Sequence, residues 1–222
     1  LHVRSRRQRQ MCIRDRLHTA LAVYGCVLGY DLIADEMKDK ELSELVKRIG
    51  LVEGMPVVTN PGIIDPEKFA DEVINVRIPN PFMPDTPQRI ATDTSQKVGI
   101  RYGETIKSYV AKDGSARALT AIPLAIAGWC RYLLGIDDNG EAFELSPDPM
   151  ADELKCQLDG IVWGESSSYT GQLKNLLSNA NIFGINLYEA GIGDKIEEMF
   201  VEEIAGKGAV RNTLKKLSLI HI

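Results

Sequence analysis

Residues 118–130 place the strongest constraint on how this chain can fold, because they form a mainly apolar run that is flanked on both sides by arginine. A membrane-spanning helix needs about 20 such residues, so a run of thirteen that contains Pro123 is typical of a buried core helix. The surrounding pattern predicts that this helix covers residues 115–134 and is closed by Gly135. We therefore expect a globular protein without a membrane partner.

Composition agrees with that class, since 44% of the 222 residues are hydrophobic and 26% are charged. Disordered, collagen-like and disulfide-stapled chains are excluded on these values. The four cysteines (Cys12, Cys26, Cys130 and Cys156) show no CxxC spacing, which indicates reduced thiols in a cytoplasmic protein rather than a metal cluster. The formal net charge is -5 and no basic stripe follows the first residues, so nucleic acid is not an expected partner.

The two ends of the chain differ from its middle. Six of the 26 Lys and Arg residues lie in positions 1–16, where only Asp15 opposes them. Such an arm could bind nucleic acid or act as a transit peptide. However, the strings at 8–16 and 218–222 look like translated sequencing-adapter sequence, and we expect residues 1–16 and 218–222 to be non-native. The natural part, 17–217, is then a fragment with 20 basic and 30 acidic residues, and His18 is its only histidine.

Helical spacing of apolar residues recurs along the chain, and convincing alternating strands are absent. Asp65 and Pro66 supply an N-cap and a proline at the first helical position, which predicts a helix that runs to about Arg77. Gly50 is the expected C′ residue of a helix over 41–49. The other predicted helices cover 17–37, 88–92, 93–112, 151–158, 166–178, 186–205 and 210–217. The fold class is therefore mainly α, with a single multi-helix domain.

A proline-rich loop and the helix pair after it carry a candidate anion site. Residues 77–87 contain four prolines and should form an ordered loop, and Asp93 with Gln96 fits a capping box at the next helix. Arg89 would then end one helix while Lys97 lies in the first turn of the next, against the helix dipole. Arg89 and Lys97 could hold a carboxylate beside the exposed N–H groups of that turn. Alternatively, both are solvated cations that pair with Asp85 and Asp93.

His18 opens a helix whose other face is apolar, and from its position alone it could be structural or functional. No second histidine or cysteine cluster stands at a ligand spacing, so no zinc site is expected. The glycines do not form a strand–GxGxxG–helix unit, and a nucleotide-binding fingerprint is therefore absent from the sequence.

Several ordered motifs resemble the substrate domain of the polyol-specific long-chain dehydrogenases. This is the mannitol dehydrogenase family, which includes fructuronate (mannonate) and tagaturonate reductases. The similarity covers nearly all of 17–217. The matching stretches are Leu17-His18-Thr19-Ala20-Leu21 with Gly25 and Gly29-Tyr30, Arg77-Ile78-Pro79-Asn80-Pro81 with Asp85-Thr86, Arg89-x3-Asp93-x-Ser95-x-Lys97 with Thr94 in place of the usual Gly, the segment 125–132, and Asp148-Pro149.

The resemblance implies an NAD-dependent oxidoreductase acting on an open-chain sugar acid or hexitol, most simply fructuronate and mannonate. Mannitol 2-dehydrogenase and tagaturonate reductase are close alternatives. A non-catalytic helical interaction module and a nucleic-acid binder are alternatives from other classes. The family's Rossmann domain, which binds NAD, is absent from this sequence. Oligomeric state stays open.

The resemblance also assigns roles to single residues. His18 falls on the histidine of the family's Lys-x4-Asn-x2-His motif, and Arg89 and Lys97 fall on positions that contact substrate oxygens or carboxylate. Gln10 and Asp15 occupy the lysine and asparagine positions of that motif. A glutamine does not exchange a proton near neutral pH, so the chain as written should be inactive although its parent enzyme is active.

Overall fold

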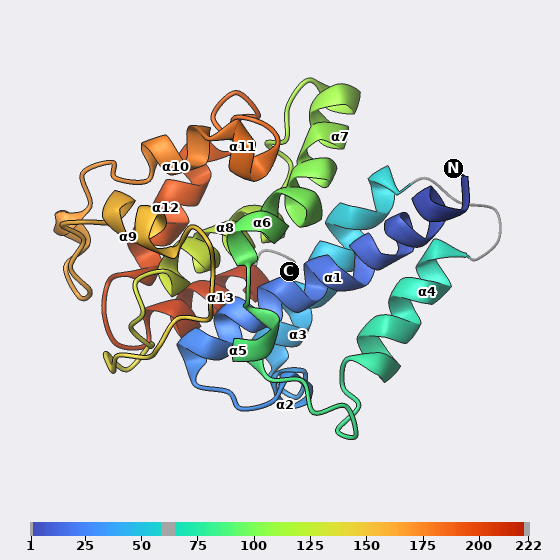
Figure 1. Ribbon diagram of the computed structural model, residues 1–222, viewed down its shortest axis with the longest axis horizontal. Coiled ribbons are helices and arrows are strands. Elements are labelled where there is room, and N and C mark those ends of the chain that lie inside the picture. Colours follow the sequence, from blue (N-terminus) through green and yellow to red (C-terminus); the bar gives the residue numbers. More distant parts are fainter. Residues whose placement is uncertain (1, 59–64, 220–222) are drawn as a thin grey trace.

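The computed structural model describes residues 2–58 and 65–219. Within them the regular secondary structure is helical apart from one isolated bridge between Ile136 and Ala142, and turns and loops join the helices. The predicted mainly α class is confirmed (Figure 1). The segments η1, η3 and η4 are π-helical, and η2 and η5 are 3-10 turns. The helices are α1 (His2–Leu28), α2 (Ile33–Glu36), α3 (Lys40–Lys47), η1 (Arg48–Gly54), η2 (Met55–Val57), α4 (Pro66–Glu72), η3 (Val73–Arg77), α5 (Pro87–Ile90), α6 (Thr94–Val98), η4 (Gly99–Gly103), α7 (Glu104–Asp113), α8 (Ala121–Tyr132), α9 (Ala151–Gln157), η5 (Ser166–Ser168), α10 (Lys174–Ser178), α11 (Ala180–Phe183), α12 (Gly193–Glu203) and α13 (Ala209–Leu219).

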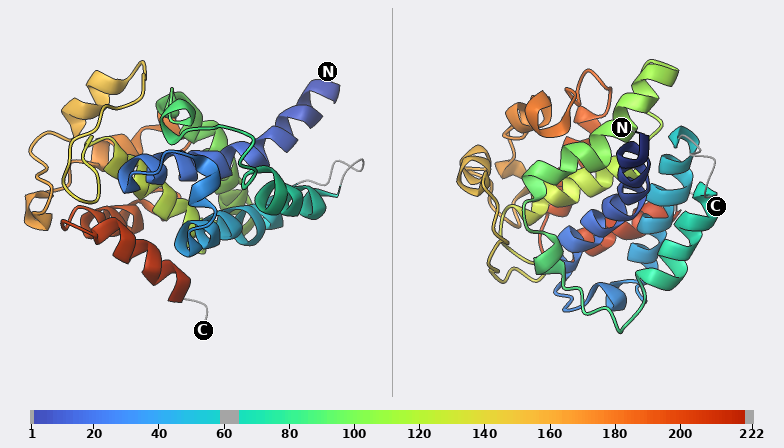
Figure 2. Two further views of the ribbon diagram at one scale, coloured as in Figure 1. Left: turned by 90° about the horizontal axis from the view of Figure 1, so that it is seen from below. Right: turned by 45° about the vertical axis from the view of Figure 1, so that its right-hand side comes forward.

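The apolar run forms the central helix α8, and every one of its residues is buried. It packs against α1 and α12, while α5 crosses α1 and α13 packs on α3 and α12 (Figure 1). The first turns of α1 extend beyond the other helices (Figure 2). In this arrangement α1 lies between the proline-rich loop and η4. The candidate site is formed at this part of α1.

Helix α8 begins at Ala121, six residues later than the sequence pattern predicted. The backbone before Ala121 forms a hydrogen bond outside the helix, because the N–H of Ala116 donates to the carbonyl of Ala190 at 2.8 Å. A carboxylate from another segment then caps the helix. Glu53 accepts hydrogen bonds from the backbone N–H groups of Thr120, Ala121 and Ile122 at 2.6, 2.6 and 2.8 Å.

Gly50 was wrongly predicted to end its helix. Helix α3 continues without interruption into η1, so Gly50 lies inside a helical segment and is buried. In contrast, the N-cap at Asp65 is confirmed, since its side chain accepts the N–H of Glu67 at 3.0 Å and the helix runs through η3 to Arg77. Local capping was therefore predicted correctly at one helix start and failed at one helix end.

Two glycines let α11 approach the centre of the molecule. An added Cβ at Gly99 would collide with the carbonyl oxygen of Ile182, and one at Gly103 would collide with the carbonyl oxygen of Phe183. Both collisions involve backbone atoms, which cannot rotate away as a side chain can. The i, i+4 spacing of these glycines therefore forms a groove that holds the end of α11.

The substitution Gly103→Ala is expected to destabilise the domain by about 1–3 kcal/mol, the usual cost of overpacking. An alanine inside a helix would otherwise add about 1 kcal/mol over glycine, so the sign of the effect reports the collision. Gly50→Ala is the matched control. A Cβ added at Gly50 would lie 3.2 Å from the side-chain end of Ile74 and 3.3 Å from that of Leu17, and both of these can move aside. Urea unfolding of both variants measures the difference, and equal midpoints would contradict the expected clash.

In the core between α1, α8 and α12, the hydrogen-bond geometry indicates that the carboxyl group of Glu203 is protonated. The hydroxyl oxygen of Tyr24 lies 2.8 Å from the carbonyl oxygen of Leu124 and 2.7 Å from Oε1 of Glu203, and both side chains are fully buried. One hydroxyl proton serves only one acceptor, so both contacts are hydrogen bonds when the carboxyl group of Glu203 keeps its own proton. Burial accordingly raises the pKa of Glu203 to about 8.

Arg131 lies in the same core and is fully buried. Its guanidinium donates to three backbone carbonyls outside α8: Glu203 at 3.2 Å through Nε, Ile136 at 2.6 Å through Nη1 and Asp137 at 2.9 Å through Nη2. The side chain therefore ties the end of α8 to the end of α12 and to the turn after α8.

Candidate active site

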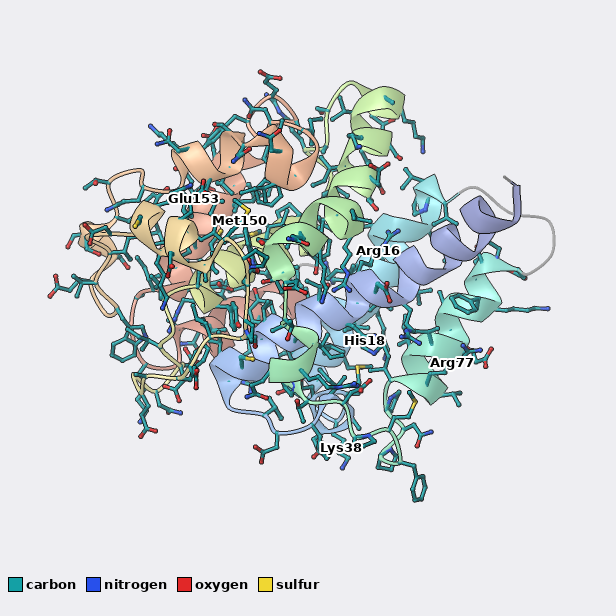
Figure 3. The ribbon with its side chains drawn as sticks, viewed as in Figure 1. Arg16, His18, Lys38, Arg77, Met150 and Glu153 are labelled. Atoms are coloured by element: carbon teal, nitrogen blue, oxygen red, sulfur yellow. The ribbon has the colours of Figure 1, made fainter. Side chains whose placement is uncertain are left out.

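A cavity of about 200 Å³ lies between α1, the end of η3 and the proline-rich loop. His18 and Arg77 lie on facing elements, α1 and η3, at this position (Figure 3). The cavity is lined by Arg14, His18, Ile33, Arg77, Ile78, Met83 and Asp85. Cationic and polar groups thus share the wall with a few apolar side chains, as in a site for a small polar molecule.

His18 is buried in the wall of this cavity, with 8% of its surface exposed. Burial lowers the pKa of His18 to about 4, and the charges of Arg14 and Arg101 lower it further in the same direction. At neutral pH the ring is therefore uncharged, with one nitrogen that donates and one that accepts. A neutral imidazole suits hydrogen bonding to a hydroxyl or a carbonyl better than ionic binding of an anion.

The imidazole of His18 is expected to titrate with a midpoint near pH 4 in the folded chain and near 6.5 in the unfolded chain. The unfolded state consequently binds this proton first, and the chain loses stability as the pH falls from about 6.5 toward 4. NMR titration of the ring carbon signals measures the midpoint. His18→Gln assigns the signal, the chain in urea supplies the reference, and a folded midpoint above 6 would contradict the prediction.

Arg89 does not line the cavity itself, but it pairs with Asp85, which does. Its Nη2 forms an ion pair with Asp85, four residues earlier, and two thirds of the Arg89 side chain is exposed. Asp85 itself lines the cavity, and Thr86 caps α5 by accepting the N–H of Arg89 at 3.2 Å. The pairing of Arg89 with Asp85, which the sequence left open as an alternative, is confirmed.

Lys97 is presented by α6, whose N-terminus differs from the sequence prediction. Asp93 has a left-handed backbone with φ 54° and its side chain caps nothing, so the predicted capping box is wrong. Asp148 caps the helix instead, because its carboxylate accepts the backbone N–H of Ser95 at 2.8 Å and also the Ser95 hydroxyl. The ammonium of Lys97 donates to the carbonyl of Thr92, and Lys97 does not line the cavity.

Arg101 connects Lys97 with α1, and no motif in the sequence indicated it as a site residue. Its Nη1 donates to the hydroxyl oxygen of Thr19, the residue after His18. Burial lowers the pKa of Lys97, and the charge of Arg101 lowers it further; the same charge also lowers the pKa of His18. Lys97 and Arg101 therefore lie beside the neighbouring face of α1. The i, i+4 spacing of these two residues on one helix was the available signal.

Arg77 also escaped selection as a site residue. In the sequence it is only the first residue of the stretch Arg77-Ile78-Pro79-Asn80-Pro81, yet in the structure it lines the cavity opposite α1. Its position at the C-terminal end of η3, directly before the proline-rich loop, could have indicated a role, since such loops often position functional groups. The structure thus brings together His18, Arg77 and the Asp85–Arg89 pair, and it leaves Lys97 next to them rather than among them.

The family comparison agrees with this arrangement of helices. The mannitol dehydrogenase C-terminal domain matches residues 2–204. The chain belongs to this family. It is 56% identical over 202 residues to a D-mannonate oxidoreductase of Thermotoga maritima, a match that covers 90% of this chain and 37% of that protein. It is also 31% identical over 138 residues to a D-mannonate oxidoreductase of Escherichia coli, across 62% of this chain and 27% of that protein.

A solved structure has the same fold. Pseudomonas fluorescens mannitol 2-dehydrogenase, in a ternary complex with NAD and D-mannitol, superposes with a TM-score of 0.81 at 22% identity, covering 95% of this chain and 40% of that one. The chain thus spans well under half the length of these relatives. Among the described helices, none is long and apolar enough to cross a membrane.

Proposed function

We propose that this chain is the substrate-binding domain of an NAD-dependent oxidoreductase that interconverts fructuronate and mannonate. The observation that carries the proposal is the cavity in which a neutral imidazole at His18 faces the guanidinium group of Arg77. Such a cavity suits an open-chain sugar that carries both a carbonyl and an anionic group. The similarity to D-mannonate oxidoreductases supports the choice of substrate.

In this proposal His18 orients the substrate and is the catalytic residue contributed by the described helices. Its neutral ring can donate to the carbonyl oxygen or accept from the alcohol, which aligns the reacting carbon. Arg89 and Lys97 bind substrate oxygens by exchanging their present partners, the carboxylate of Asp85 and the carbonyl of Thr92. Asp85, the partner of Arg89, lines the cavity, which supports this role for Arg89.

The cofactor is proposed to be NAD, whose reduced form would supply a hydride to the carbonyl and whose oxidised form would accept one from the alcohol. No strand–glycine loop–helix unit occurs within residues 2–58 and 65–219, so the described chain does not fit a dinucleotide. We therefore assign NAD binding to the remainder of the parent protein. A cytoplasmic location belongs to the same proposal, and it is supported by Cys26, Cys130 and Cys156, which are unpaired.

The terminal segments 1–16 and 218–222 are proposed to be non-native, and this affects the chemistry. Gln10 and Asp15 stand where the family motif has lysine and asparagine. Neither residue supplies the proton that a reduced carbonyl needs at neutral pH. The chain as written is consequently expected to bind substrate without turning it over, while the parent with its own upstream residues is active.

NADH oxidation by the full-length parent tests the proposed activity with fructuronate, tagaturonate and fructose as separate substrates. The expected order places fructuronate first, and His18→Gln should lower kcat by at least tenfold. Lys112→Gln, on the exposed end of α7, is the control and should leave the rate unchanged. A preference for fructose would favour a mannitol 2-dehydrogenase, the activity named for the superposed structure. The absence of NADH oxidation with all three substrates would refute the proposal.

A further inference from the structure

The cavity beside His18 carries an excess of positive charge. Arg14 and Arg77 contribute two guanidinium groups to its wall, and Asp85 contributes the only carboxylate among the residues that line it. Arg14 belongs to the segment proposed to be non-native and pairs with Asp15 at 3.8 Å, so Arg77 alone carries the inference. That carboxylate is already paired with Arg89 outside the cavity. A ligand that enters is therefore met by cationic charge that the lining residues do not balance, which favours an anion.

Arg77 is held in an orientation that leaves part of its guanidinium available. Its Nε and Nη2 donate to one oxygen of Glu72 at 3.1 and 2.9 Å, and its charged end lies 5.3 Å from the ring centre of Phe69. These contacts use one edge of the planar group, and the Nη1 side can donate to another acceptor. Because about half of each side chain is exposed, the Glu72 pair contributes little and does not prevent a second carboxylate from binding.

His18 and Arg77 provide different chemistry on facing walls. The ring of His18 is neutral at physiological pH and suits a carbonyl or hydroxyl group. The planar guanidinium donors of Arg77 match a carboxylate in a way that a lysine does not. A molecule with a carbonyl or alcohol near one end and a carboxylate at the other can therefore contact both.

We propose that Arg77 binds the substrate carboxylate and makes the site selective for sugar acids over neutral polyols. The proposal rests on the proposed function for the position of the reacting group at His18. It assigns the anionic end of the substrate to the end of η3. Arg89, which is mostly exposed and paired with Asp85, then serves the neighbouring oxygens rather than the carboxylate.

Binding of D-mannonate and D-mannitol to the 222-residue chain tests this inference, because the two ligands differ by a carboxylate in place of a hydroxymethyl group. Calorimetric titration should give a lower Kd for mannonate. Arg77→Gln should raise the mannonate Kd at least tenfold and leave the mannitol Kd unchanged, and Arg77→Lys should fall between. In NMR spectra of the wild-type chain, the Nε–H signal of Arg77 should shift with mannonate and stay in place with mannitol.

Two variants serve as controls. Arg117→Gln removes an exposed arginine outside the cavity and should change neither Kd. Glu72→Gln removes the competing carboxylate and should lower the mannonate Kd. Undetectable mannonate binding, equal binding of the two ligands, or an unchanged mannonate Kd in Arg77→Gln would each overturn the inference.

The result is separable from the proposed activity. If the full-length parent reduces fructuronate but Arg77→Gln binds mannonate normally, only the role of Arg77 fails. If mannonate binding depends on Arg77 but the parent does not oxidise mannonate, only the proposed reaction fails.

Discussion

Arg131→Met is expected to lower the free energy of unfolding by roughly 4 kcal/mol, because it leaves three backbone carbonyls without their donor. Methionine has a similar length and preserves much of the packing, so the loss reports the hydrogen bonds rather than an empty space. The acceptors belong to two segments, the end of α12 and the turn after α8. Both should become less protected in hydrogen exchange.

Urea unfolding followed by circular dichroism measures this effect. Arg117→Met is the matched control, since Arg117 is exposed and precedes the same helix. Its free energy of unfolding should stay within about 0.5 kcal/mol of the wild-type value. Arg131→Lys keeps the charge but loses the fork of donors, so it should lie between the two. An Arg131→Met midpoint equal to that of the control would show that the buried guanidinium contributes nothing net.

Glu203→Gln is expected to remove a pH dependence of stability worth about 5 kcal/mol. In the unfolded chain the carboxyl group of Glu203 loses its proton near pH 4.5, whereas in the folded chain its pKa is about 8. Between these values the folded state binds more protons, so stability falls by about 1.4 kcal/mol for each pH unit as the pH rises. The loss is complete above pH 8, where both states are ionised.

The measurement is the thermal midpoint of both proteins from pH 5 to pH 9. The wild-type midpoint should decline across this window, and that of Glu203→Gln should decline much less. Glu202→Gln is the control on the same helix, because Glu202 is exposed and pairs with Lys216 at 2.9 Å. A wild-type slope that survives in Glu203→Gln would assign the pH dependence to another group.

Local signals in the sequence predicted much of the fold. The apolar run became the buried helix α8, and Asp65 with Pro66 began α4 where expected. These predictions succeeded because the determining interactions lie within a few residues of each other. Helix boundaries failed where the partner is remote: Glu53 caps α8 from 67 residues away, and nothing near Thr120 in the sequence reveals it.

The candidate site was predicted in part for the same reason. Family motifs selected His18 and Arg89, and the structure brings His18 to a cavity whose wall includes the partner of Arg89. Arg77 and Arg101 were missed because their importance depends on which elements pack against α1. Periodicity and spacing describe one element at a time, and they do not reveal which elements meet.

The cap on α6 has a consequence for how the site is made in the cell. Asp148 follows Ser95 by 53 residues, and it is the side chain that accepts the first turn's N–H. During synthesis the ribosome releases α1 and α6 well before Asp148 leaves the exit tunnel. The turn that presents Lys97 therefore acquires its cap only once the second half of the domain has been made. A nascent chain interrupted before that point would carry the residues of the site without their final arrangement.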